Sequence, residues 1–288
     1  MLIRFKYLKM IYFYMDRDDF ISIDAIRFGL DILGKNLRFF IVLMIIVAIL
    51  YNIPNLIEAY FSIFQIPDGT SFMDTGLTSL LTIFFSIIIY LIVELGLLRI
   101  ALKFKDVKKA EFKDLFRGYS LLIKYLPATI IFGLMISVPF MLAIAVGIIA
   151  DRGTSYVIIY IIALIIAVVA TGFLHLKYQF YGYFIVDRRC GPLEALQHSG
   201  KATKGVLKNL IIFWLEMILG IAFALFTVSI FIEIPVGLIL QFISEDLAPL
   251  AGGLVNSAIR LFIILPLTKL ATADIYRRLE WRSQAATL

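Results

Sequence analysis

The chain contains the stretch YVIIYIIALIIAVVATGFL, residues 156–174, in which no side chain carries a charge. The stretch belongs to an apolar run over residues 156–184, which is long enough to cross a hydrocarbon core about 30 Å thick. A segment that crosses a membrane must satisfy its own backbone hydrogen bonds, and this run does not alternate as a barrel strand would. The stretch therefore predicts a membrane-spanning helix.

Five more apolar runs of similar length occur along the chain, over residues 39–60, 77–102, 121–150, 209–243 and 249–275. Only 17% of the 288 residues are charged and 61% are hydrophobic, whereas about 25% charged residues is usual in a soluble domain. The sequence thus predicts an all-α, polytopic transmembrane bundle of six spans. We expect one integral membrane domain over residues 21–282, with an N-terminal extension over 1–20 and a C-terminal tail over 283–288.

The basic residues predict how this bundle is oriented. All but two of the 27 lysines and arginines lie before the first span, around the second or fourth connection, or near the C-terminal end. The exceptions are Arg152, in a loop on the opposite side, and Arg260, within a span. The positive-inside rule puts the basic side in the cytoplasm. We therefore expect cytoplasmic termini, and we expect anionic membrane lipids rather than nucleic acid as the partner of this basic surface.

Short amphipathic stretches precede three of the spans, over residues 21–35, 111–118 and 192–205. We interpret each as an interfacial helix followed by a transmembrane hairpin, which gives three pseudo-repeats. The alternative is that they are ordinary loops between spans. The candidate contacts with lipid head groups are basic residues in or beside these stretches: Arg27, Lys35, Arg38, Lys201, Lys204 and Lys208.

Ionisable residues within the spans are candidate functional groups, because burying a charge in a bilayer is costly. Glu94, His175 and Glu216 fall at similar depths from the cytoplasmic side, which predicts an inward-facing polar pocket. The other interpretation is that they make separate interhelical hydrogen bonds. Glu233 and Arg260 lie at nearly equal distances from the turn of the last hairpin, which predicts a buried ion pair.

Motifs of known catalytic chemistry do not occur in the sequence. It has no His-Glu-x-x-His, no Gly-x-Ser-x-Gly and no glycine-rich phosphate loop. Two histidines and one cysteine are too few for a histidine-rich or cysteine-rich metal cluster. We therefore expect no enzymatic activity, no cofactor and no metal.

Three segments carry a resemblance to known proteins. They are SIDAIRFGLDILGKNLRFFIVLMII (22–46), LLRIALKFKDVKKAEFKDLFRGYSLLIKYL (97–126) and FIVDRRCGPLEALQHSGKATKGVLKNLIIFWL (184–215). Their marks are Asp187 at the end of a span, Glu194 at the start of a short helix, and Ser199 before Lys204 and Gly205. They resemble the YciC-like and glycerophosphoryl diester phosphodiesterase membrane-domain families of prokaryotic multi-pass proteins. The resemblance implies a domain of the prokaryotic cytoplasmic membrane, without the catalytic phosphodiesterase domain.

These observations favour a non-enzymatic envelope-maintenance, scaffold or assembly factor that contacts lipid or a membrane protein partner. The alternative is a transporter or lipid translocator that uses the inward-facing polar pocket.

Overall fold

The computed structural model describes residues 22–64, 72–149, 154–241 and 247–285, and every regular element within these ranges is helical. Six helical segments are long and apolar enough to cross a membrane: Leu37–Ala59, Ser79–Lys105, Phe112–Ile148, Val157–Arg188, Leu207–Gln241 and Gly252–Gln284. The predicted all-α, six-span fold is confirmed. The N-terminal extension and the turn of the last hairpin near residues 242–246 lie outside the described residues.

The long helices form three hairpins in chain order. The first two are α3 (Leu37–Phe64) with α4 (Phe72–Lys105), and α5 (Leu122–Ile149) with α6 (Thr154–Tyr178). The third joins α9 (Leu207–Val228) and α10 (Ile234–Gln241) to α11 (Leu247–Ile259) and α12 (Leu265–Ala285). Short helices lie before the hairpins: α2 (Ser22–Lys35), η1 (Phe112–Leu115), η2 (Tyr119–Leu121), α7 (Tyr181–Arg188) and α8 (Pro192–Ala202). This order agrees with the predicted alternation of short helix and hairpin.

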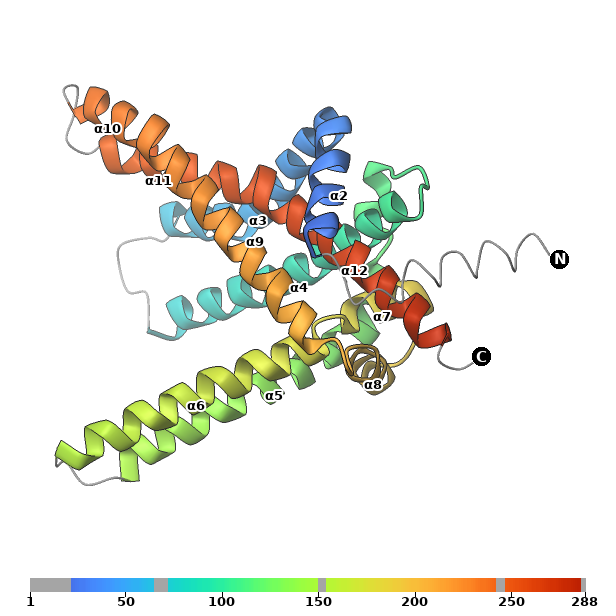
Figure 1. Ribbon diagram of the computed structural model, residues 1–288. Helices are drawn as coiled ribbons and strands as arrows, with labels where there is room; N and C mark the ends of the chain where they lie inside the picture. Colours follow the sequence, from blue (N-terminus) through green and yellow to red (C-terminus); the bar gives the residue numbers. More distant parts are fainter. Residues whose placement is uncertain (1–21, 65–71, 150–153, 242–246, 286–288) are drawn as a thin grey trace.

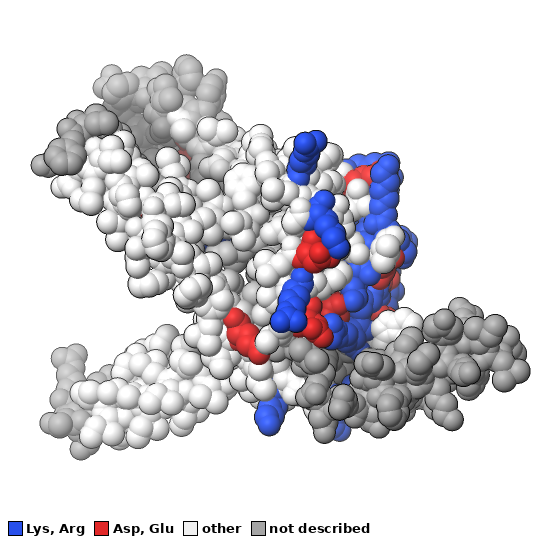
Figure 2. Space-filling view, turned by 45° about the horizontal axis from the view of Figure 1, so that its top comes forward, with Lys and Arg blue, Asp and Glu red and all other residues white. Residues whose placement is uncertain are grey.

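The hairpins spread apart from a common base (Figure 1). Lysine, arginine and acidic residues gather at that base, while the spreading helices are almost free of them (Figure 2). In the most apolar stretch of the span that contains α5, only 6% of the residues are buried inside the protein. The corresponding stretch of the span formed by α4 is 33% buried. The protein core therefore lies at the base, where α4, α7, α8 and α12 meet, and the second hairpin presents its apolar surface outward.

The fourth span is not continuous over residues 156–184, as the sequence had led us to expect. The helix breaks between Tyr178 and Tyr181, where buried hydroxyl groups in α8 and just after it form hydrogen bonds with the backbone. Ser199 and Thr203 donate to the carbonyl of Lys177 at 3.0 and 3.1 Å. The N–H of Phe180 in turn donates to Ser199 Oγ at 3.2 Å. The backbone groups at this break are therefore satisfied by hydrogen bonds inside the protein.

Two prolines explain why the third hairpin is irregular. A π-turn over Ser229–Glu233 ends shortly before Pro235, and a second one over Arg260–Ile264 ends shortly before Pro266. Proline lacks an N–H and clashes with the carbonyl four residues earlier, so a wider turn relieves the conflict. Both legs of this hairpin therefore contain a local change of helical register.

Two glycines allow the short helices to approach the long ones closely. A Cβ on Gly29 of α2 would lie 2.8 Å from Leu267 Cδ1 of α12 and 3.2 Å from the Leu267 carbonyl oxygen. A Cβ on Gly96 of α4 would lie 2.1 Å from the carbonyl oxygen of Leu115, so η1 can rest on α4 only at a glycine. The buried side of α2 thus packs on protein, and its position at a membrane surface stays a prediction.

Candidate functional site

Arg277 of α12 is the centre of an ion network at the base. Its guanidinium donates to Asp106, just after α4, through Nε to Oδ1 and Nη2 to Oδ2, both at 2.8 Å. It also donates to both oxygens of Asp187 at the end of α7, at 2.7 and 2.9 Å, and to Glu280 at 2.6 Å. Arg188 donates to the same Glu280 at 3.0 and 3.2 Å. One side chain therefore connects the ends of all three hairpins at the charged base.

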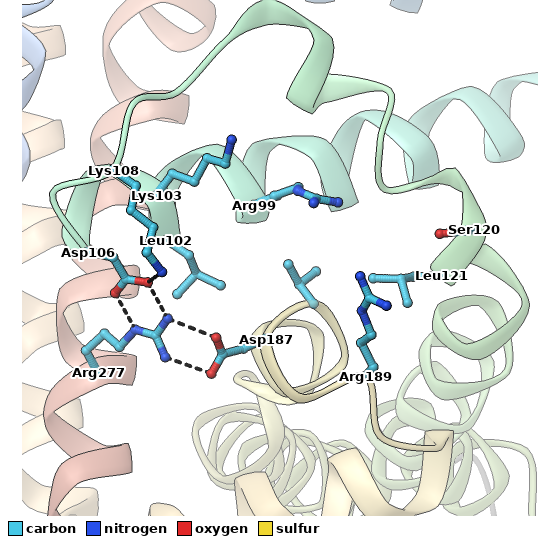
Figure 3. Close-up of a pocket in the computed structure, with 11 residues that line it drawn as sticks. Arg99, Leu102, Lys103, Asp106, Lys108, Ser120, Leu121, Asp187, Arg189 and Arg277 are labelled. Carbon is cyan, nitrogen blue, oxygen red and sulfur yellow. Dashed lines mark hydrogen bonds and ion pairs between the residues drawn. The ribbon is translucent and has the colours of Figure 1, made fainter.

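A cavity of about 200 Å³ adjoins this network. Its lining comes from the end of α4, the loop after it, the start of the second hairpin, the end of α7 and, through Arg277, from α12. The lining residues are Arg99, Leu102, Lys103, Asp106, Lys108, Ser120, Leu121, Val186, Asp187, Arg189 and Arg277. Five of these residues are basic and two are acidic, so the lining carries a formal excess of three positive charges. Figure 3 shows Arg99 and Arg189 on different sides of the open space, with Arg277 engaged by the two aspartates.

The backbone beside this cavity is strained at two places. Val107 has φ 55° and Arg189 has φ 54°, a left-handed conformation that is rare for residues other than glycine. Val107 lies between two lining residues, and Arg189 is itself part of the lining. Conformations of this kind cost about 1–3 kcal/mol and cluster at functional sites. The cavity is therefore the leading candidate for a functional site.

Glu94 lies within a span and is paired with Lys269. The Lys269 ammonium donates to Glu94 Oε1, which joins α4 to α12, and both side chains are largely buried. Tyr183 of α7 donates to the carbonyl of Lys269 at 2.9 Å. Lys269 belongs to the basic group at the C-terminal end of the sequence, but its partner is an intramembrane carboxylate. This pair satisfies a charge that would otherwise be costly in the bilayer.

The structure does not bring the predicted polar pocket of Glu94, His175 and Glu216 into the cavity lining. The His175 ring lies against aromatic rings of neighbouring helices, with centroids 5.8 Å from Phe132 and 6.2 Å from Trp214. Glu216, on α9, is partly buried. Glu94 and His175 therefore have separate surroundings.

The expected ion pair between Glu233 and Arg260 is not among the ion pairs of the described residues. Glu233 Oε1 instead accepts a hydrogen bond of 2.6 Å from Asn256 Nδ2, on the facing helix. Arg260 is exposed, and it begins the π-turn that changes the helical register after Asn256. The side chain that meets Glu233 therefore lies one helical turn before the residue that equal depth had indicated.

The six candidate head-group residues are all exposed: Arg27, Lys35, Arg38, Lys201, Lys204 and Lys208. Lys35 pairs with Asp31 of its own helix at 2.7 Å. A surface pair of this kind contributes little to stability, so Lys35 remains available to anionic ligands.

The start of α8 is held by Glu194, a residue that the resemblance had marked. Glu194 Oε2 accepts a hydrogen bond of 3.2 Å from the N–H of Gly191. This bond lowers the pKa of Glu194, with a smaller contribution from His198 four residues later. Glu194 therefore acts as a helix cap.

Sequence reasoning missed the network residues Asp106, Arg277 and Glu280. The signal in the sequence is the composition of the charged segments at the ends of the spans, where acidic residues are scattered among the basic ones. Searches with protein-family models, among curated proteins and among solved structures give no match to this chain.

Proposed function

We propose that this multi-pass membrane protein is a non-enzymatic scaffold or assembly factor that holds a membrane protein partner against its outward-facing hairpins. The observation that carries the proposal is the low burial of the second hairpin. In the most apolar stretch of each of its two spans, only 6% of the residues are buried inside the protein. Phe140 of α5 and Phe173 of α6 are 37% and 48% exposed on it. Contiguous apolar surfaces of this extent mark contacts with a membrane or with another protein.

The ion network at the base supports the same proposal. Because Arg277 holds the ends of the three hairpins together, the spans need not pack tightly on one another for the fold to persist. The apolar sides of the helices are then available to partners. The exposed basic residues of the base would face the anionic head groups of the cytoplasmic leaflet.

Site-specific photo-crosslinking in cells tests the proposal. p-Benzoylphenylalanine replaces Phe140 or Phe173, and the buried Phe213, 1% exposed, provides a control of matched size. We expect a discrete protein adduct at Phe140 or Phe173 and none at Phe213. Adducts with lipid alone at both exposed positions would contradict a scaffold function.

The alternative, a transporter or lipid translocator, is favoured by a different observation. The third hairpin contains two π-turns within its spans, and irregular helices of this kind often line transport sites. A cysteine at position 94 in a Cys190→Ser background distinguishes the two functions. The scaffold proposal expects no reaction with a membrane-impermeant thiosulfonate, whereas a translocation pathway requires water access to this position.

A further inference from the structure

We propose that the cavity at the end of α4 and α7 is a binding site for a phosphate group, carried either by a lipid head group or by a soluble ester. This site is independent of the hairpin surfaces that a protein partner would cover. It also differs from the six exposed residues considered above as head-group contacts, none of which lines it.

The charges of the cavity are only partly neutralised by the protein itself. Arg277 is fully engaged by its three carboxylates, and these include both acidic residues of the lining, Asp106 and Asp187. Lys108 shares Asp106 at 3.2 Å, and Lys103 is paired with the buried Asp114 at 2.7 Å. Both carboxylates of the lining, Asp106 and Asp187, therefore already have basic partners within the protein.

Arg99 and Arg189 are the two basic residues of the lining that have no carboxylate partner among the described residues. Arg99 Nη1 donates only to the carbonyl of Arg117, at 3.1 Å, which leaves most of its donors unused. The guanidinium of Arg189 lies across the space from Arg99 (Figure 3). A planar fork of N–H donors suits phosphate oxygens better than a lysine ammonium does.

The remaining lining fits the same class of ligand. Ser120 adds a hydroxyl at the edge, and Leu102, Leu121 and Val186 provide apolar side chains. The volume of 200 Å³ equals that of about seven water molecules in the liquid, which is room for a phosphate with a small organic group attached. Arg189 itself is the left-handed residue that ends α7, so one of the two unpaired guanidinium groups comes from this helix end.

An explanation without a ligand also exists, because cations are favoured at helix C-terminal ends, and both α4 and α7 end here. In that case the arginines stabilise the ends of the two helices, and the cavity is not a phosphate-binding site. The experiment below separates the two explanations.

Calorimetric titration of the purified full chain in a neutral detergent and a phosphate-free buffer tests the site. The probes are inorganic phosphate, glycerol 3-phosphate and a short-chain phosphatidic acid, with short-chain phosphatidylcholine as the zwitterionic comparison. We expect one binding site per chain. Binding of phosphatidic acid alone identifies a lipid head group as the source, and binding of glycerol 3-phosphate or inorganic phosphate identifies a soluble one. If none of the three phosphate probes, inorganic phosphate, glycerol 3-phosphate and phosphatidic acid, shows saturable binding, the proposal is overturned.

Variants connect the binding to the cavity. Arg99→Gln with Arg189→Gln should weaken binding at least about tenfold, because the variant removes both guanidinium groups that have no carboxylate partner. The matched control, Arg38→Gln with Arg282→Gln, removes two exposed guanidinium groups outside the lining and should change affinity less than about twofold. Equal losses in both double variants would show diffuse attraction to the surface and overturn the proposal. If the first double variant does not fold, Arg189→Gln alone replaces it, because this side chain is exposed. We expect Arg189→Gln to weaken binding as well.

Discussion

Arg277 and Asp187 meet through two parallel hydrogen bonds, Nη1 to Oδ2 at 2.7 Å and Nη2 to Oδ1 at 2.9 Å, which join α12 to the end of α7. The same guanidinium holds Asp106 in a second fork. This arrangement places a single side chain between the three hairpins, although its partners lie 90 and 171 positions away in the chain.

Removing that guanidinium should destabilise the protein strongly. In Arg277→Gln, three partly buried carboxylates lose their common partner, so we expect unfolding to become easier by about 3 kcal/mol. Cys190 reports the change because it is the only cysteine and is buried, and burial raises the pKa of its thiol. Its maleimide labelling in increasing concentrations of dodecyl sulfate measures unfolding.

Arg282→Gln is the control for this measurement, because it removes an exposed arginine from the same helix. Its labelling midpoint should agree with that of the wild type. A midpoint for Arg277→Gln that matches Arg282→Gln would rule out a central role for the network.

The pair of Glu94 and Lys269 should behave as a coupled unit. Glu94→Gln and Lys269→Gln each leave one charge unpaired inside a span, so we expect each to cost about 3 kcal/mol. The double variant leaves no unpaired charge and should cost clearly less than the sum. Additive costs in the same Cys190 labelling assay would mean that the two charges do not interact.

Glu233 should be coupled to Asn256 rather than to Arg260. A double-mutant cycle of Glu233→Ala and Asn256→Ala should give a coupling of about 1 kcal/mol, typical of hydrogen bonds between membrane helices. The cycle with Arg260→Gln serves as the comparison and should give additive costs. Stronger coupling to Arg260 would restore the ion pair expected from sequence.

The spans could be predicted from the sequence because membrane crossing depends on local hydropathy and on the length of each run. The break after Tyr178 could not, because it depends on hydroxyls of Ser199 and Thr203 supplied by the next short helix. Nothing in residues 156–184 alone indicates that the carbonyl of Lys177 has these partners.

The candidate site was predictable only in part for a related reason. Searching the spans for ionisable residues identified Glu94, but the partner Lys269 was assigned to the basic surface because it lies near a chain end. Equal depth along the hairpin did not identify the partner of Glu233 either, because Asn256, one turn before Arg260, is the residue that donates to it. The cavity itself is lined by four separate chain segments, around residues 99–108, 120–121, 186–189 and 277, so its lining exists only when all four are in place.

The pH dependence of stability should contain a contribution from Glu194. The hydrogen bond from the Gly191 N–H lowers its pKa in the folded protein below the ordinary value of 4.5. A lowered carboxyl pKa gives stability that is present above that value and is lost as the pH falls through the folded pKa. Glu194→Gln should therefore be less stable than wild type at pH 7, and the difference should shrink below pH 4.5. A difference that stays constant down to pH 3 would exclude this contribution.

The central claim is that the charged base, which holds the ion network and the phosphate cavity, lies on the cytoplasmic side of a six-span bundle. Paired alkaline phosphatase and green fluorescent protein fusions in cells measure sidedness directly. Fusions after residues 113 and 204 should be cytoplasmic, and fusions after residues 68, 151 and 246 should be external, because nearly all lysines and arginines lie on the first side. A cytoplasmic readout at two of the three external positions would contradict the claim.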